Sequence, residues 1–225
     1  MEIRPIAYIQ TEFAEKFGIP RQSGLADNIR GRIVFEKEYR DPEALRGIEG
    51  FSHIWLLWEF SANRGGRTWQ PTVRPPRLGG NRQMGVFATR SPFRPNPLGL
   101  SCVELDHVDW DAQDGPVIVV RGADLMDGTP IYDIKPYIKY ADSHPDAKCG
   151  YVDSLSEDRL DVCIPEEIQD SFSAHASVES LKEVLALDPR PSYHDDPMRE
   201  YGMSFAGYNV RFRVDGHVLY VVSIS

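Results

Sequence analysis

The sequence predicts a mainly β protein, with an antiparallel barrel or sandwich in the longer N-terminal part and a small α+β unit at the C-terminus. Three observations support this fold class. Short segments rich in β-branched and aromatic residues are separated by glycine and proline turns. Few stretches have a helical period, and no glycine-rich turn of the Rossmann type follows the first predicted strand. At 225 residues, the chain is long enough for one large and one small domain.

Strand-like segments begin near the N-terminus. Residues 3–9 and 31–36 have strand composition, and Pro5 confines the first of them to a sheet edge or a strand start. Residues 41–47 begin with Asp-Pro and end with Gly, which predicts a helical turn with a capping residue and a stop. Residues 51–60 are apolar on both faces, so we expect a central strand there.

The middle and C-terminal parts contain the remaining predicted elements. Strands are expected at residues 84–89, 98–108 and 116–122, with an Asp-Gly turn before the last of them. Residues 177–187 begin with a serine cap and have apolar residues at helical spacing, which predicts a helix. A hairpin with the two-residue turn Asp215-Gly216 is expected over residues 208–224. We therefore expect a barrel domain over residues 1–140, an acidic linker with a short helix over 141–170, and an α+β domain over 171–225.

Cysteine, histidine and hydropathy patterns exclude several protein classes. The three cysteines, Cys102, Cys149 and Cys163, have spacings that suit neither a disulfide framework nor a metal site, so we expect reduced, mostly buried thiols in a cytoplasmic protein. The six histidines lack metal-ligand spacing, and His53 is expected to be a satisfied core residue, so no bound metal is predicted. The longest apolar run, residues 54–58, is too short to span a membrane.

The charge is distributed unevenly along the chain. The net charge is −9, yet residues 60–103 contain seven arginines and no acidic residue. Guanidinium groups bind phosphate or carboxylate through paired hydrogen bonds and stack on bases. An anionic ligand or RNA therefore explains this segment better than surface ion pairs alone, which stabilise a fold only weakly.

Three segments combine proline and glycine with arginine, asparagine and aspartate. They are residues 72–81 (TVRPPRLGGN), 88–101 (ATRSPFRPNPLGLS) and 124–137 (DLMDGTPIYDIKPY). Proline fixes the backbone and glycine permits close approach of a ligand, so these segments are expected to form rigid loops. Their composition is typical of a preformed binding site.

These same segments carry a resemblance to a known family. PTVRPPRLGGN, GVFATRSPFRPNPLGLS and DLMDGTPIYDIKPY, together with PRQSGL, FSHIW, DPRPSY and NVRFRV, resemble the TsaA/TrmO family of S-adenosylmethionine-dependent tRNA methyltransferases over nearly the whole chain. The resemblance implies a β-barrel catalytic domain, a small C-terminal domain and a homodimer. It also implies methyl transfer to the exocyclic nitrogen of threonylcarbamoyl-adenosine at tRNA position 37, in the anticodon stem-loop.

The resemblance places the cofactor on matching motifs. The residues expected to contact S-adenosylmethionine are Ser23, Gly24, Leu25, Ser61, Ala62, Arg90, Leu100, Gly122, Ala123, Asp124 and Asp127. On chemical grounds, Asp127 or backbone carbonyls would suit the positive sulfonium, and Arg90 would suit the cofactor carboxylate.

Two further sets of residues are inferred from chemistry and charge. For catalysis, Asp133 or Tyr137 would accept the proton of the substrate nitrogen, and Lys135 or Arg94 would hold the threonyl carboxylate. RNA binding is expected at Arg64, Arg67, Arg74, Arg77 and Arg82. Two alternatives stay open: a non-catalytic RNA- or nucleotide-binding barrel, and an enzyme that methylates another base or a small adenosine derivative.

Overall fold

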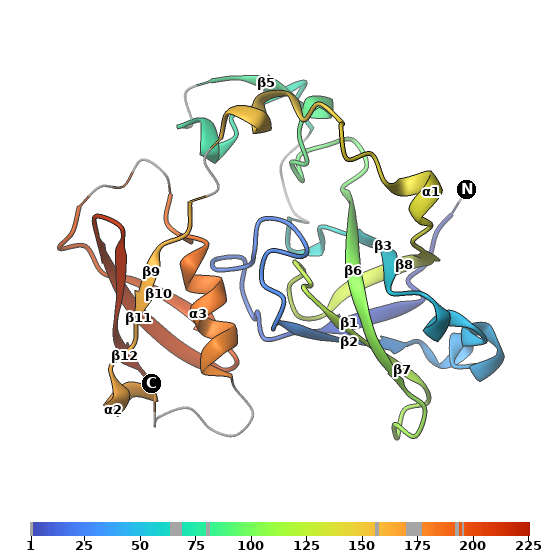
Figure 1. Cartoon of the computed structure of the whole chain (residues 1–225). Coiled ribbons are helices and arrows are strands. Elements are labelled where there is room, and N and C mark those ends of the chain that lie inside the picture. The colour runs from blue at the N-terminus through green and yellow to red at the C-terminus, as the bar shows by residue number, and fades with distance from the viewer. Residues whose placement is uncertain are drawn as a thin grey trace.

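The computed structural model describes residues 2–63, 69–79, 82–155, 158–169, 177–191, 194 and 196–225. Two β-sheet units make up the molecule, and a long segment from α1 (Lys139–Asp142) to β9 (Asp161–Cys163) connects them, as Figure 1 shows. A third, two-stranded sheet, β4 (Thr72–Val73) with β5 (Met84–Gly85), lies within the arginine-rich segment. None of the helices in the described residues is both long and apolar enough to cross a membrane.

The N-terminal unit is a closed barrel in which all neighbouring strands are antiparallel. In order around the barrel, its strands are β1 (Ala7–Gln10), β2 (Arg30–Phe35), β7 (Val117–Arg121), β6 (Leu98–Asp109), β3 (His53–Glu59) and β8 (Thr129–Pro136). The predicted central strand is confirmed, because β3 is paired with β6 on one side and β8 on the other. Its residues Ile54, Leu56 and Trp58 are buried in the barrel core, while the alternate residues lie on the outer face.

Strand β8 corrects one prediction. Residues 124–137 were expected to form a rigid loop, but most of them belong to the strand that closes the barrel. The strand tolerates two prolines because Pro130 and Pro136 are its second and last residues, near its ends. The pairing of β8 with β3 also shifts register near Leu57.

Short 3-10 helices connect the barrel strands. They span Lys37–Tyr39, Pro42–Leu45, Ile48–Gly50, Ser61–Asn63, Pro76–Leu78 and Val86–Ala88, and a further 3-10 helix, Gly150–Ser154, lies between α1 and β9. The predicted turn after residue 41 is confirmed, since the Asp41 carboxylate accepts a hydrogen bond from the Glu43 backbone N–H at 3.0 Å. The predicted strand over residues 84–89 is wrong beyond Gly85, because Val86–Ala88 turn into a 3-10 helix that Thr89 Oγ1 closes by donating to the Val86 carbonyl at 2.9 Å.

The C-terminal unit is a four-stranded sheet packed on one helix. Its strands, in order, are β10 (Tyr201–Phe205), β11 (Tyr208–Asp215), β12 (Val218–Ile224) and β9, and α2 (Glu166–Gln169) and α3 (Val178–Ala186) complete it. The predicted helix and Asp-Gly hairpin are confirmed, whereas β10 and β9 were not predicted. Strand β9 pairs parallel to β12, so part of the segment expected as a linker belongs to this sheet.

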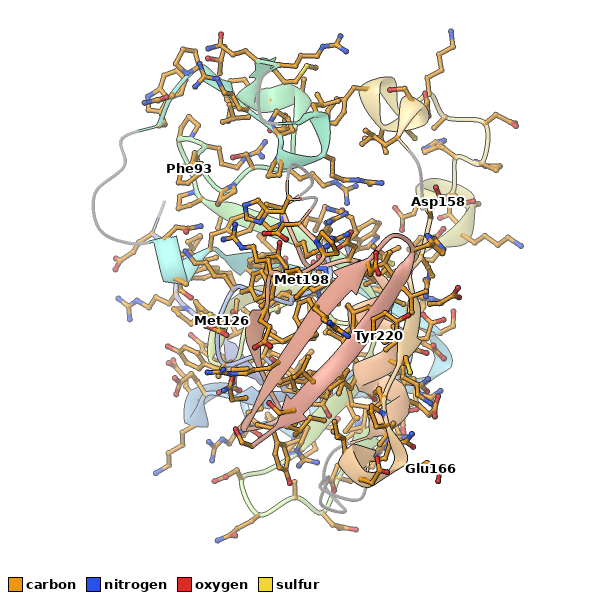
Figure 2. The ribbon with its side chains drawn as sticks, turned by 90° about the vertical axis from the view of Figure 1, so that its left-hand side faces the viewer. Phe93, Met126, Asp158, Glu166, Met198 and Tyr220 are labelled. Atoms are coloured by element: carbon orange, nitrogen blue, oxygen red, sulfur yellow. The ribbon has the colours of Figure 1, made fainter. Side chains whose placement is uncertain are left out.

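The sheet has one buried and one exposed face. Phe212 and Leu219 are fully buried beneath α3, while Tyr220 lies on the opposite face, which Figure 2 shows turned towards the viewer. The Arg213 guanidinium lies 5.6 Å from the centre of the Tyr220 ring. Three N-terminal residues, Phe13, Ala26 and Ile29, belong to this second core, so the two units share apolar contacts.

The cysteine prediction is partly wrong. Cys149 and Cys163 are exposed and Cys102 is half-buried. Cys163 is exposed because it lies on an edge strand, opposite the exposed Tyr220. His53 is also only half-buried, and its Nδ1 lies 2.9 Å from Ser52 Oγ.

Candidate active site

A cavity of about 490 Å3 opens at one end of the barrel. Five stretches of chain form its wall: residues 16–22, the end of β3 with residues 60–63, residues 89–94, the start of β6, and residues 124–129. The predicted residues in the wall are Ser61, Ala62, Arg90, Arg94, Leu100 and Asp124. The second and third proline- and glycine-rich segments therefore both contribute to one pocket.

Asp124 connects the cavity to the barrel core through hydrogen bonds. The indole Nε1 of Trp58 donates to Ser101 Oγ at 3.0 Å, and the Ser101 hydroxyl donates to Asp124 Oδ1 at 2.6 Å. Burial raises the pKa of the Asp124 carboxyl, while hydrogen bonds from Ser101 and the Ser23 backbone and the charge of Arg90 oppose that rise. Ser23, Arg90 and Asp124, three predicted cofactor residues, are thus brought together.

The PRQSGL loop approaches the end of β7 closely. Gly24 N–H donates to the Gly122 carbonyl at 2.9 Å, and Gly122 N–H donates to the Ile29 carbonyl at 2.9 Å. Gly122 has a φ of +68°, and a Cβ atom there would lie 3.1 Å from the Gly24 backbone. A larger residue at position 122 would therefore push the loop away from the cavity.

Six predicted cofactor residues do not line the cavity: Ser23, Gly24 and Gly122, described above, and Leu25, Ala123 and Asp127. Leu25, the last residue of the PRQSGL loop, is half-buried, and Ala123 is fully buried in the barrel core. Asp127 is exposed and accepts a hydrogen bond from the Thr11 backbone N–H at 3.0 Å, which fixes the turn before β8. Its carboxylate therefore already has a structural role.

Three of the four predicted catalytic residues do not line the cavity, although Lys135 and Tyr137 are neighbours of Trp55, which does. Asp133 and Lys135 form an ion pair of 2.8 Å and lie opposite Leu57 and Trp55, on the outer face of the barrel. The Tyr137 ring centre lies 6.1 Å from that of Trp55. Arg94, in contrast, lines the cavity.

The sequence reasoning missed several residues of the wall. Glu59 ends β3 at the cavity, and the Tyr132 hydroxyl donates a hydrogen bond to its carboxylate. Trp58 and Phe60 contribute aromatic surface, with ring centres 4.4 Å apart. A single acidic residue at the end of an otherwise apolar strand, followed by Phe-Ser, was the one signal that could have identified Glu59.

Four cationic side chains in the wall donate hydrogen bonds to uncharged oxygen atoms. Lys16 donates to Asn63 Oδ1, and Arg90 donates to Gln22 Oε1. Arg21 donates to the Asp188 carbonyl at 2.7 Å, and Arg94 donates to the carbonyls of Thr89 and Ser91 at 3.1 and 3.3 Å. Because an uncharged acceptor leaves the positive charge in place, this wall favours anionic ligands.

The arginine-rich segment continues this positive surface. Burial and the neighbouring Arg77 lower the pKa of Arg21, against the opposing charge of Asp188. Arg77 is half-buried on the 3-10 helix Pro76–Leu78, and Arg74 and Arg82 are exposed. The other two predicted RNA-binding arginines, Arg64 and Arg67, lie outside the described residues.

Within the residues that the structure describes, no three His, Cys, Asp or Glu side chains are grouped so as to hold an ion. The described wall offers carboxylates, guanidinium groups and aromatic rings.

Comparisons with known proteins agree with this architecture. The family model of the tRNA-methyltransferase O N-terminal domain matches residues 8–143, and that of the TrmO C-terminal domain matches residues 157–225. The tRNA (adenine(37)-N6)-methyltransferase of Escherichia coli (strain K12) is 41% identical over 223 residues, 95% of this chain and 93% of the relative. A Pseudomonas aeruginosa relative, RcsF, whose name places it provisionally among the S-adenosylmethionine-dependent methyltransferases, is 40% identical over 208 residues, 89% of this chain and 87% of the relative.

Solved structures extend the likeness to the three-dimensional fold. A crystal structure of TrmO from P. aeruginosa superposes with a TM-score of 0.80 at 34% sequence identity, covering 100% of this chain and 96% of the other. With two family models over most of its length, the chain belongs to the tRNA-methyltransferase O (TrmO) family of S-adenosylmethionine-dependent tRNA methyltransferases.

Proposed function

We propose that this protein methylates the exocyclic nitrogen of adenosine 37 in tRNA, and that its target is the threonylcarbamoyl form of that nucleoside. The observation that carries the proposal is the charge of the cavity wall: Lys16, Arg21, Arg90 and Arg94 all donate to uncharged oxygens. The threonyl group carries a carboxylate and RNA carries phosphates, so a positive wall suits both. The names of the relatives support the tRNA substrate, while the threonylcarbamoyl group is our inference.

The residues around Asp124 fit S-adenosylmethionine. This cofactor has a positive sulfonium and amino group and a negative carboxylate, and the wall offers the Asp124 carboxylate and the Arg90 guanidinium near each other. Trp58, Phe60 and Leu100 add apolar surface for an adenine ring. When bound, the cofactor supplies the methyl group for transfer.

The chain's own residues then have three tasks. Arg90, Asp124 and the PRQSGL loop hold the cofactor, and Arg94 holds the threonyl carboxylate in the same cavity. The substrate nitrogen must lose a proton, and we propose Glu59 as its acceptor because it lines the cavity, whereas Asp133 and Tyr137 lie outside the wall. Alignment of the two ligands and exclusion of water supply the remaining rate enhancement.

The arrangement of the whole molecule follows from this proposal. The barrel over residues 1–140 is the catalytic domain, and residues 171–225 form the C-terminal domain together with β9 from the connecting segment over residues 141–170. A tRNA substrate places the enzyme in the cytoplasm, and Arg74 and Arg82 would contact the anticodon stem-loop. We also propose a homodimer, supported by the exposure of Phe87 at 74%, which a second copy would cover. Analytical ultracentrifugation tests the dimer.

The substrate assignment is tested with two tRNA preparations. Purified protein is incubated with S-adenosylmethionine and tRNA that either carries or lacks the threonylcarbamoyl group, and the nucleosides are analysed by mass spectrometry. We expect a methyl group only on the threonylcarbamoyl nucleoside. Equal methylation of both preparations would overturn the threonylcarbamoyl assignment and leave adenosine itself as the target.

The rival function, a non-catalytic RNA-binding barrel, is separated by cofactor binding. Calorimetry in the presence of EDTA should show binding of S-adenosylmethionine, because no metal is needed for the proposed contacts. Binding of tRNA without any heat from the cofactor would favour the rival.

A further inference from the structure

The loop over residues 20–29 lies between the cavity and the C-terminal unit. Pro20, Arg21 and Gln22 line the cavity at one end of the loop. At the other end, Ala26 and Ile29 are buried in the same apolar cluster as Leu181 and Leu185 of α3. Figure 1 shows this part of the N-terminal chain next to α3.

Helix α3 holds the far end of the loop with three hydrogen bonds to one residue. Glu183 accepts from the Asn28 backbone N–H at 2.9 Å through Oε2 and from Asn28 Nδ2 at 2.6 Å through Oε1. Ser180, one turn earlier and buried, donates from its hydroxyl to the Asn28 carbonyl at 3.1 Å. The backbone and side chain of Asn28 are therefore both fixed by this helix.

Two more hydrogen bonds join the C-terminal part of the chain to the loop, one at the loop backbone and one at the end of the loop that lines the cavity. Arg159 donates to the Leu25 carbonyl at 2.8 Å, and the Asp188 carbonyl after α3 accepts from Arg21 at 2.7 Å. The loop is thus attached to the C-terminal unit at residues 21, 25 and 28.

The opposite side of the same loop faces the proposed cofactor site. Gln22 accepts from Arg90, the Ser23 backbone lies close enough to the Asp124 carboxylate to lower its pKa, and Gly24 N–H donates to the Gly122 carbonyl at 2.9 Å. A displacement of the loop at Asn28 would therefore also displace the loop residues that face the cavity. A loop already held in its binding conformation loses less conformational entropy when a ligand binds.

We propose that the C-terminal unit positions this loop for cofactor binding, and that Glu183 is the positioning residue. The proposal rests on the function argued above, because it assigns a role toward the cofactor of that same site. It gives the C-terminal unit a part in the chemistry although α3 contributes no residue to the cavity wall. The role is indirect, since Glu183 acts through Asn28.

The first test is Glu183→Gln in the full chain. The new amide can accept only one of the two hydrogen bonds, and its N–H2 group faces a donor at the other. We expect the Kd for S-adenosylmethionine to rise about tenfold, the usual effect of losing one hydrogen bond to a charged group. The KM for the cofactor should rise by the same factor, and kcat at saturating cofactor should stay near the wild-type value.

A second variant restores the interaction with reversed polarity. Combining Glu183→Gln with Asn28→Asp lets the new amide N–H2 donate to the new carboxylate while its oxygen accepts from the residue-28 backbone N–H. The double variant should recover most of the lost affinity, whereas Asn28→Asp alone places two carboxylates together and should bind the cofactor less tightly than the wild type. The matched control is Glu179→Gln, on the same helix, where the side chain is exposed and forms an ion pair with Lys182 at 3.4 Å.

The outcomes separate this inference from the proposed function. If the wild-type protein binds no S-adenosylmethionine, the function fails, and the inference fails with it. If the wild type binds but Glu183→Gln binds equally well, the function stands and the positioning role is overturned. A lower melting temperature with unchanged Kd and KM also overturns it, because that pattern indicates simple domain packing. An equal loss of affinity in Glu179→Gln would do the same, as it would indicate a general effect of charge.

Discussion

Ser101 and Asp124 are joined by a hydrogen bond of 2.6 Å, although they lie on different segments of the barrel wall. Ser101 is almost fully buried. Its hydroxyl donates this bond to Asp124 and accepts another from the indole Nε1 of Trp58 at 3.0 Å. Its hydroxyl therefore connects an aromatic ring of the cavity wall to the carboxyl group that faces the cavity. The position of one core serine thus affects both packing and the charge state of the proposed cofactor site.

We predict that Ser101→Ala moves the acid limb of the pH profile to higher pH. The Ser101 hydrogen bond lowers the pKa of Asp124 against the effect of burial, so removing it raises that pKa further. Because the ionised carboxylate is proposed to bind the cofactor, kcat/KM for S-adenosylmethionine should begin to fall at a higher pH than in the wild type. The measurement is kcat/KM across the pH range for both proteins.

The same variant should also lose ~1–3 kcal/mol of folding stability, because the Trp58 N–H is left without its acceptor. Ser52→Ala is a suitable control, since Ser52 is exposed and its hydroxyl lies 2.9 Å from Nδ1 of the neighbouring His53, far from the Asp124 carboxyl in the sequence. An unchanged pH profile in Ser101→Ala would contradict the assignment of Asp124.

Gly99→Ala is predicted to destabilise the barrel. A Cβ atom at Gly99 would lie 2.3 Å from the Trp58 ring, and the ring is confined by the core and by its bond to Ser101. We expect a loss of ~1–3 kcal/mol from overpacking, measured by chemical denaturation. Gly85→Ala is the matched control, because a Cβ atom there meets nothing within 4 Å and the backbone φ of −58° suits alanine. Equal stabilities for the two variants would show that Trp58 can move.

The barrel strands could largely be predicted because their sequence signal is local. Residues 31–36, 51–60, 98–108 and 116–122 all correspond to strands, since β-branched and aromatic residues bounded by turn residues mark each segment alone. Strand β8 was missed because Pro130 and Pro136 are typical of loops, and only closure of the barrel against β1 reveals that they lie near strand ends. Closure depends on residues far apart in the sequence, which no local pattern contains.

The candidate site likewise contains residues that local sequence motifs predicted and residues that only the folded structure identifies. The motif residues Arg90, Arg94 and Asp124 line one cavity, as their composition suggested. Glu59 was missed because its relevance depends on where β3 ends relative to β6 and on the contact with Tyr132. The contact between Asn28 and Glu183 joins residues 155 positions apart, and neither residue lies in a recognisable motif.

We predict that Arg74→Gln combined with Arg82→Gln weakens tRNA binding and makes it less sensitive to salt. Both side chains are exposed in the arginine-rich segment. If each contacts one phosphate, the slope of log K against log salt should become shallower by ~0.7–0.9 per arginine, or ~1.4–1.8 for the pair. Affinity for S-adenosylmethionine should not change, because neither residue lines the cavity.

The control for the salt experiment is Arg211→Gln with Arg213→Gln. These exposed arginines lie on the outer face of the C-terminal sheet, where Arg213 packs on Tyr220. A salt slope that changes equally in both double variants would indicate a general charge effect. A wild-type slope in the Arg74 and Arg82 variant would end the assignment of that segment as the RNA-binding surface.

Glu12 lies at the contact between the barrel and the C-terminal sheet. Its backbone carbonyl accepts from Ala206 N–H at 2.9 Å, and among the described residues its Oε2 has no hydrogen-bond partner. Burial raises the pKa of this carboxyl from 4.5 to about 6. Between those values the folded protein keeps a proton that the unfolded chain releases, so this group's contribution to stability falls as the pH rises from 4.5 to about 6.

Glu12→Gln stays neutral and should raise the melting temperature at pH 8 while leaving it nearly unchanged at pH 4.5. Thermal denaturation at several pH values measures this difference, with Glu38→Gln as the control at an exposed carboxylate. A constant difference between Glu12→Gln and wild type at all pH values would show that Glu12 keeps its ordinary pKa in the folded protein.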